Sequence, residues 1–309
     1  MVLPIVNILA ATVELSTPIL LAAIGEILTE RSGVLNLGVE GIMLLGAFGG
    51  FWGTYVSSNP AIGILIGIII GLLVGLLVAF WSVKLRADQV VTGLGIWILG
   101  LGLSSFLARR VFGPAPGSLI IGGINPASVP LLSDIPVLGQ IFFKQNILVY
   151  VALILVPMCW IILFRTTFGL KIRAVGENPK AADTMGINIF KVRYLCVILG
   201  AALAGLAGSY LTVARFHIWI DEIVAGRGWL ALVVVWFGKR NPPRALVGAW
   251  LFGLIYALQY YFQATAAWIP YQFLLMLPYV LTILFLVGIV GREETPGAFT
   301  VPYEREETK

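Results

Sequence analysis

Three polar residues stand inside or beside long apolar runs, where their side chains could act on a solute that crosses a membrane. Asn36 and Glu40 are four residues apart at the start of an apolar run, so they share one face of a helix. Such groups can line an aqueous route or hydrogen-bond a hydroxyl group of a solute, and Glu40 can equally cap or brace the neighbouring turn. Glu14 lies about 13 Å into the first apolar run if that run is helical, and a charge at that depth is a functional hypothesis by default. The sequence therefore predicts substrate-pathway contacts at Asn36, Glu40 and Glu14.

Patterns that support catalysis do not occur in the sequence. It has no G-x-x-x-x-G-K-[ST] motif, so the chain is not its own ATPase, and it has no H-E-x-x-H motif. The single histidine, His217, falls in a predicted outer loop, which leaves metal or histidine chemistry without a basis. We therefore expect no enzyme activity, no catalytic residues, no metal site and no cofactor.

The composition is typical of a polytopic membrane protein. Of the 309 residues, 59% are hydrophobic and 11% are charged, and the mean hydropathy is +0.98. Because a spanning helix needs about 20 mostly apolar residues, we predict an all-α, polytopic transmembrane helical bundle with about 9–10 membrane segments, including broken or half-spanning helices. The candidate segments are residues 5–28, 37–56, 61–83, 90–108, 147–164, 194–213, 229–237, 245–262 and 271–290. Residues 1–291 are expected to form a single transmembrane domain and 292–309 a flexible cytosolic tail.

Small residues mark the faces on which two of these segments are expected to pack. Glycines recur every four residues in the third segment, and small residues recur in the sixth. Such faces let another helix backbone approach closely. The residues are Gly63, Gly67, Gly71, Gly75, Ala201, Ala204, Gly205 and Gly208.

The basic residues predict an orientation. If the loop 165–193 faces the cytosol and the segments alternate, 15 of the 20 Lys and Arg residues fall on the inner side. This excess follows the positive-inside rule, and it accounts for the net charge of +5 without any binding of nucleic acid. The N-terminus then lies outside and the C-terminal tail lies in the cytosol.

Three polar stretches interrupt the apolar segments and give further indications of function. In the loop 165–193, Pro179 follows Asn178, which predicts a short helix that begins at the proline and ends near Gly186. Charge alone is compatible with a loop that lies on anionic lipid or with a docking element for a cytosolic partner. The stretches 30–41 and 225–243 are interrupted by glycine or proline, which is typical of broken helices at a transport pathway, or of a tight loop before a half-spanning helix.

The same three stretches resemble the permeases of ABC importers, in the branch that carries simple sugars, nucleosides and branched-chain amino acids. RAVGENPKAADTMGIN looks like the coupling loop of these permeases, and SGVLNLGVEGIMLLGA is similar to their second-helix signature. GRGWLALVVVWFGKRNPPRALVGAWLFG resembles their late glycine-bounded segment, although the family is usually richer in glycine around Lys239 and Arg240. The GVxNLGxEG form looks most like permeases that are paired with lipoprotein receptors for purine nucleosides.

The resemblance implies that the chain is the transmembrane subunit of an importer in the plasma (inner) membrane. The importer would move a nucleoside by alternating access, and a simple sugar is the second candidate substrate. The resemblance also implies three protein partners: a cytosolic ABC ATPase dimer, a second permease subunit that is a paralogue or a second copy, and an extracytoplasmic solute-binding lipoprotein. The ATPase-coupling residues that it implies are Arg173, Gly176, Glu177, Asn178, Pro179 and Lys180. The alternative is an ion-coupled secondary transporter of a small polar solute that uses Glu14, Glu26 or Glu40, and such a carrier has no need of a coupling loop.

Overall fold

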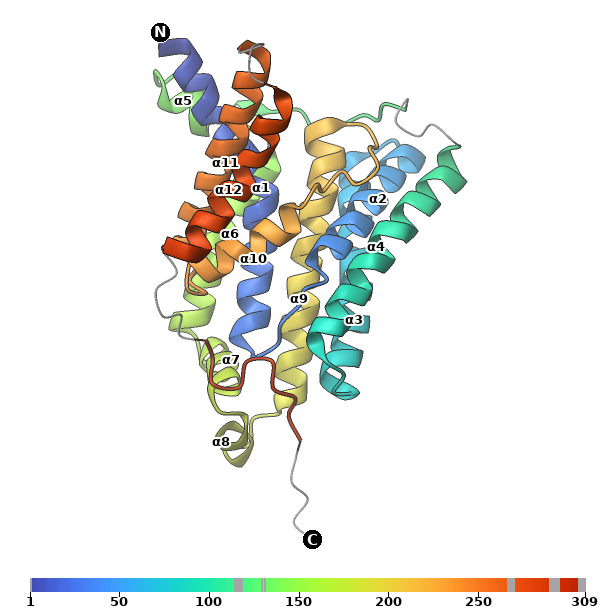
Figure 1. Cartoon of the computed structure of the whole chain (residues 1–309), viewed down its shortest axis with the longest axis vertical. Coiled ribbons are helices and arrows are strands. Elements are labelled where there is room, and N and C mark those ends of the chain that lie inside the picture. The colour runs from blue at the N-terminus through green and yellow to red at the C-terminus, as the bar shows by residue number, and fades with distance from the viewer. Residues whose placement is uncertain are drawn as a thin grey trace.

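Most residues are helical in the computed structural model, which describes residues 2–113, 119–128, 130, 132–265, 270–288 and 295–304 (Figure 1). Each of the nine predicted segments coincides with a helix, which confirms the all-α bundle. These helices are α1 Val2–Arg31, α2 Val39–Ser57, α3 Pro60–Ala79, α4 Gln89–Phe112, α6 Ile147–Arg165, α9 Ile189–Tyr210, α10 Arg227–Phe237, α11 Pro242–Thr265 and α12 Tyr271–Gly288. Two of them continue into π-helical turns, η1 Phe80–Lys84 after α3 and η3 Leu211–Phe216 after α9.

Short elements fill the longer connections. Between α4 and α6 lie α5 Leu138–Phe142 and two antiparallel strands, β1 Ala127–Ser128 and β2 Lys144–Gln145. The loop 165–193 contains α7 Thr167–Glu177 and α8 Pro179–Thr184. The helix at α8 was predicted from Pro179, and the structure confirms it.

Six helices within the described ranges are long and apolar enough to cross a membrane. They are Pro4–Arg31, Pro60–Lys84, Gln89–Phe112, Ile147–Arg165, Ile189–Phe216 and Pro242–Thr265. In contrast, α10 has 11 residues and is about 16 Å long, roughly half the thickness of a hydrocarbon core. The predicted half-spanning helix is therefore present.

Backbone-to-backbone packing joins α2, α3 and α9. The four glycines of α3 are all buried, and a Cβ atom on any of them would meet backbone or short side chains of α2 or α9. Gly67 faces the carbonyl of Gly46, for example, and Gly71 faces the carbonyl of Ala201. The small-residue faces that the sequence predicted in the third and sixth segments are the surfaces on which these helices meet.

The start of α1 and residues 295–304 lie at opposite ends of the bundle, and α7 and α8 lie at the same end as residues 295–304 (Figure 1). This arrangement agrees with the predicted orientation, which stays a prediction. Residues 295–304 follow the surface of the bundle next to α7, where they make several hydrogen bonds. The flexibility predicted for the tail 292–309 also stays a prediction. Within this tail, residues 292–294 and 305–309 lie outside the described ranges.

Candidate functional site

The half-helix α10 begins on a carboxylate of α2. Gly226, with φ 79°, takes the left-handed conformation that glycine tolerates best, and it turns the chain into α10. The backbone N–H groups of Gly226 and Gly228 donate to the two carboxylate oxygens of Glu40, at 2.8 Å and 2.7 Å. A carboxylate in this place satisfies two of the free N–H groups of the first turn and complements the positive end of the helix dipole. Glu40 therefore braces the start of α10, the alternative role that the sequence left open.

A second carboxylate holds the other end of the same helix. Glu30, at the end of α1, is fully buried and forms an ion pair with Arg240 at 2.7 Å. The indole N–H of Trp236 donates to the other oxygen of Glu30 at 3.0 Å. Arg31 donates from Nε to the carbonyl of Arg240, which adds a second link from α1 to this turn. The start of α10 is thus fastened to the first turn of α2, and the other end to the last turn of α1.

The turn after α10 has an unusual backbone. Lys239 and Arg240 have φ angles of 51° and 53°, a region that non-glycine residues seldom adopt. Glycine reaches this conformation without strain, so the two positions favour glycine on physical grounds. In this chain the buried side chain of Arg240 keeps the turn in place.

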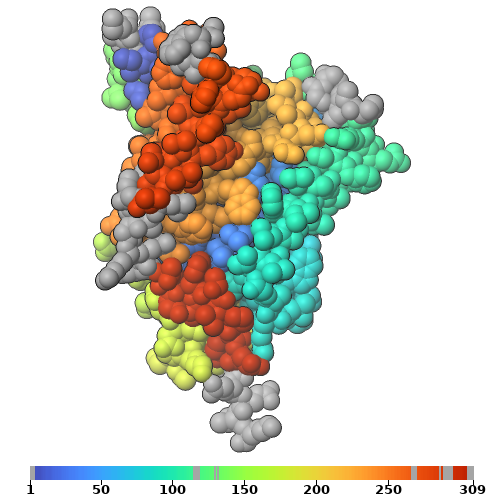
Figure 2. Space-filling model, viewed as in Figure 1, coloured from blue at the N-terminus to red at the C-terminus, as the bar shows by residue number. Residues whose placement is uncertain are grey.

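A cavity of about 510 Å³ opens beside α10, on the face that Figure 2 shows hollowed between α4 and the α10–α12 region. Its wall is mostly apolar and aromatic, and polar groups stand at a few places. Trp97 of α4 and Trp229 of α10 meet edge to face, with their ring centroids 5.5 Å apart. The lining residues are Glu40, Leu44, Trp97, Leu101, Glu222, Ala225, Gly226, Trp229, Leu230, Val233, Tyr279 and Thr282.

The three residues that the sequence assigned to the pathway lie in three different settings. Glu40 lines the cavity while it caps α10. Asn36 is fully buried in the turn before α2, where its side-chain NH₂ donates to Glu26 at 3.1 Å and its oxygen accepts from the N–H of Gly38. Glu14 is half-buried and pairs with Arg215 at 3.3 Å. The structure thus brings only Glu40 to the cavity, and the pathway roles of Asn36 and Glu14 remain predictions without that support.

The predicted coupling residues come together around the junction of α7 and α8. Asn178 ends α7 with its backbone N–H and begins α8 with its side chain, which accepts from Ala181 at 3.0 Å. Gly176 packs against the backbone of Arg31, and Arg173 stacks on Phe164 with its guanidinium 5.3 Å from the ring centroid. Pro179 and Lys180 form the first turn of α8. A two-helix corner at one end of the bundle is a suitable shape for contact with another protein.

Sequence reasoning missed several residues at these sites. Trp97 lies within an apolar helix, so no local signal marks its position on a cavity. Trp229 follows Gly226 and Gly228, and that glycine boundary was the one available clue. The partners Glu30 and Arg240 are 210 residues apart in the sequence, and residue spacing does not reveal such pairs.

A bundle of long apolar helices with a cavity beside a half-length helix is the architecture of a membrane transport protein. The chain belongs to the family described as the permease component of the branched-chain amino acid transport system, whose model matches residues 8–287. It is accordingly a multi-pass membrane protein and the permease component of an ABC transporter, and not an enzyme.

Two relatives and one solved structure show the extent of the likeness. The chain is 42% identical over 257 residues to the "Putative glucose ABC transporter permease protein TsgC13" of Haloferax volcanii. The matched region covers 82% of this chain and 77% of that protein. It is 38% identical over 305 residues to the guanosine ABC transporter permease protein NupQ of Bacillus subtilis, with 96% of each chain covered. The solved inward-facing structure of "a putative metal-chelate type ABC transporter" matches with a TM-score of 0.52 at 18% identity, over 91% of this chain and 84% of that one. The structural match supports the fold alone.

Proposed function

We propose that this chain is the permease subunit of an importer for nucleosides, with purine nucleosides as the preferred class. The observation that carries the proposal is the aromatic cavity beside α10. A nucleoside has a flat base and a hydroxyl-rich ribose, and stacking of a base on an aromatic side chain contributes about 1–3 kcal/mol. Trp97 and Trp229 offer such ring surfaces, while Glu222, Tyr279 and Thr282 supply polar groups for the ribose or the edge of the base.

The size of the cavity and the relatives support the same class of substrate. A volume of about 510 Å³ falls within the range of about 300–1,000 Å³ that is typical of small-molecule sites. The guanosine permease matches this chain over 96% of its length, and the glucose permease matches it over 82%. A simple sugar is the second candidate on the strength of that relative. Two indole rings in one cavity favour a solute with a flat base.

The carboxylates support an ATP-driven mechanism over an ion-coupled one. Glu40 uses both oxygens to hold backbone N–H groups, Glu26 accepts a hydrogen bond from Asn36, and Glu14 is paired with Arg215. A proton-coupled carrier needs a carboxylate that gains and loses its proton during each cycle, and each of these three groups already has a structural partner. In our proposal, a cytosolic ATPase dimer docks on α7 and α8. A second permease subunit completes the pathway, and an extracytoplasmic lipoprotein delivers the solute.

Uptake measurements on indole variants test the substrate class. Trp229→Ala and Trp97→Ala are expected to weaken the apparent affinity for guanosine by about tenfold, as the loss of one stacked base contact would give. Trp229→Phe should recover most of that loss, because it keeps an aromatic face. Trp52→Ala is the matched control, since Trp52 lies on α2 with 38% of its side chain exposed and does not line the cavity.

The assay uses membrane vesicles that contain the permease, its ATPase and its lipoprotein, with labelled guanosine and with unlabelled nucleosides and glucose as competitors. Competition by nucleosides, with no effect of glucose, is the expected result. Uptake of glucose without uptake of any nucleoside would overturn the substrate class. Unchanged guanosine affinity in both tryptophan variants would remove the cavity from substrate binding.

A further inference from the structure

A segment near the C-terminus, residues 296–304, lies across the end of the bundle that carries α7 and α8, and we call it the C-terminal strap (Figure 1). Its first contacts are with the last turn of α7. The N–H of Gly297 donates to the Glu177 carboxylate at 3.0 Å, and the N–H of Ala298 donates to the carbonyl of Gly176 at 2.9 Å. The strap is therefore attached to the helix that precedes the α7–α8 corner.

The next residue of the strap reaches the turn that follows α10. The ring of Phe299 lies against the guanidinium of Arg240, 4.8 Å from carbon Cζ to the ring centroid. Arg240 is 1% exposed and is the ion-pair partner of Glu30 at the end of α10. Two adjacent strap residues, Ala298 and Phe299, therefore contact α7 and the turn that ends α10.

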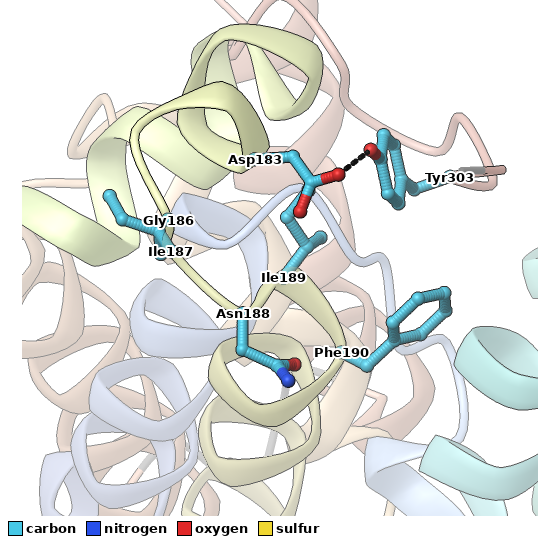
Figure 3. A pocket seen from close by; sticks show the side chains of 7 residues that line it. All are labelled: Asp183, Gly186, Ile187, Asn188, Ile189, Phe190 and Tyr303. Carbon is cyan, nitrogen blue, oxygen red and sulfur yellow. Dashed lines mark hydrogen bonds between the residues drawn. The ribbon is translucent and has the colours of Figure 1, made fainter. Parts of the chain in front are cut away.

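Further contacts hold the strap in register. Thr300 donates from its N–H to the carbonyl of Gly33 at 3.1 Å, and Arg193 donates from Nη1 to the carbonyl of Val301 at 3.0 Å. The hydroxyl of Tyr303 donates to Asp183 of α8 at 2.9 Å, across a small pocket at the start of α9 (Figure 3). These contacts come from α8, α9 and the α1–α2 connection, so the position of Phe299 is set from both sides.

We propose that the C-terminal strap is a positioning element that transmits movement of the α7–α8 corner to α10, with Phe299 as its contact on Arg240. The proposal rests on the docking of the ATPase at α7–α8 that was proposed above. A displacement of α7 would move Gly297 and Ala298 through their hydrogen bonds, and Phe299 would carry that shift to Arg240. Because α10 is a short, rigid helix that lines the cavity, a shift at its C-terminal end alters the cavity wall at Trp229.

The kind of contact suits this role. A cation–π contact is worth about 0.5–2 kcal/mol according to how well it is shielded from water, so it can be broken and remade in each cycle. Arg31 makes a second link between the two regions, through its hydrogen bond to Arg240 and its packing against Gly176. The strap and Arg31 of α1 are therefore two parallel links between α7 and the turn after α10. Removal of the strap should weaken the transmission of movement without unfolding the bundle.

A cysteine reporter on the cavity tests the proposal without any substrate. Ala225, an exposed residue at the cavity, is replaced by cysteine in a protein whose two natural cysteines are replaced by serine. The rate at which a water-soluble maleimide modifies this cysteine is then measured in the assembled transporter, with and without ATP. The variants are Phe299→Ala, Phe299→Leu and Phe299→Tyr, and the matched control is Val301→Ala, whose side chain is 53% exposed.

In the parent protein, ATP is expected to change the modification rate. Phe299→Ala and Phe299→Leu should hydrolyse ATP at the basal rate while the ATP-dependent change in modification shrinks by about three- to tenfold, in line with the loss of one cation–π contact. Phe299→Tyr and Val301→Ala should behave like the parent. If Phe299→Ala does not assemble, Phe299→Leu carries the test, because it keeps the apolar volume.

Two results would overturn the inference. One is a full ATP-dependent change in Phe299→Ala and Phe299→Leu, whether or not their thermal stability falls, and the other is no response to ATP in the parent protein. The substrate proposal fails separately. A parent protein that responds to ATP but transports no nucleoside would leave the strap proposal standing and refute the nucleoside assignment.

Discussion

Replacement of Glu40 by glutamine separates a bracing role from a direct role in transport. The carboxylate accepts two backbone N–H bonds, from Gly226 and Gly228, and Glu40 is 5% exposed. Hydrogen bonds to a charged group contribute about 1.5–3 kcal/mol each, and neutral ones about 0.5–1.5 kcal/mol. Glutamine keeps one acceptor and turns an NH₂ group toward the other N–H. With the smaller favourable interaction with the helix dipole included, we expect a loss of about 2–4 kcal/mol.

Thermal unfolding of the purified permease in detergent measures this loss. At about 2–4 °C per kcal/mol, the apparent melting temperature of Glu40→Gln should fall by about 4–16 °C. Glu222→Gln is the matched control, because Glu222 lines the same cavity and its side chain makes no hydrogen bond within the described part of the chain. A Glu40→Gln variant as stable as this control would refute the bracing argument. If that stable variant had also lost uptake, the carboxylate would act on the solute.

Three further predictions concern the orientation, the coupling corner and the strained turn. A cysteine at Ser58 should react with an impermeant reagent from outside, and one at Thr308 only after permeabilisation; labelling of both from one side contradicts the orientation. Glu177→Lys should reduce transport-linked ATP hydrolysis and leave membrane insertion intact, and normal coupled hydrolysis would exclude this corner from the mechanism. Lys239→Gly should raise stability by about 1 kcal/mol relative to Lys239→Ala, because φ is 51° there; equal melting temperatures would show that the turn stores no strain.

The membrane helices could be predicted because each one is an apolar run of helical length. The half-helix α10 was also recognisable, since glycines bound its short apolar run on both sides. In contrast, α7 was treated as part of a polar loop. Its signals were present but weak, namely Thr166 as an N-cap that accepts from Gly169, and the apolar residues Ile172 and Val175 on one face. The loop 165–193 holds eight charged residues, and this high charge made the helical pattern hard to recognise.

The site was predicted only in part, because its contacts join distant segments. The spacing of Asn36 and Glu40 predicted that both lie on one helix face, and this was wrong for Asn36, because α2 begins only at Val39. Asn36 lies in the turn before α2 and bonds to Glu26, while Glu40 reaches Gly226 and Gly228. The contacts of the C-terminal strap were even harder to predict from the sequence. The tail 292–309 as a whole has a mixed charge that suggests a free end, and the strap residues 297, 298 and 300 are held through their backbone N–H groups, which have no sequence signature.

The glycine face of α3 has a consequence for how freely the sequence of this helix can change. An alanine at Gly63, Gly67 or Gly71 would press its methyl group against a neighbouring backbone, which cannot move aside as a side chain can. The opposite face carries Leu65, Ile69 and other exposed apolar side chains, where one aliphatic residue can replace another. In a saturation library of α3, the position of a residue should therefore decide which substitutions are tolerated. Every fourth residue should be restricted to glycine, and the outward positions should accept almost any apolar residue.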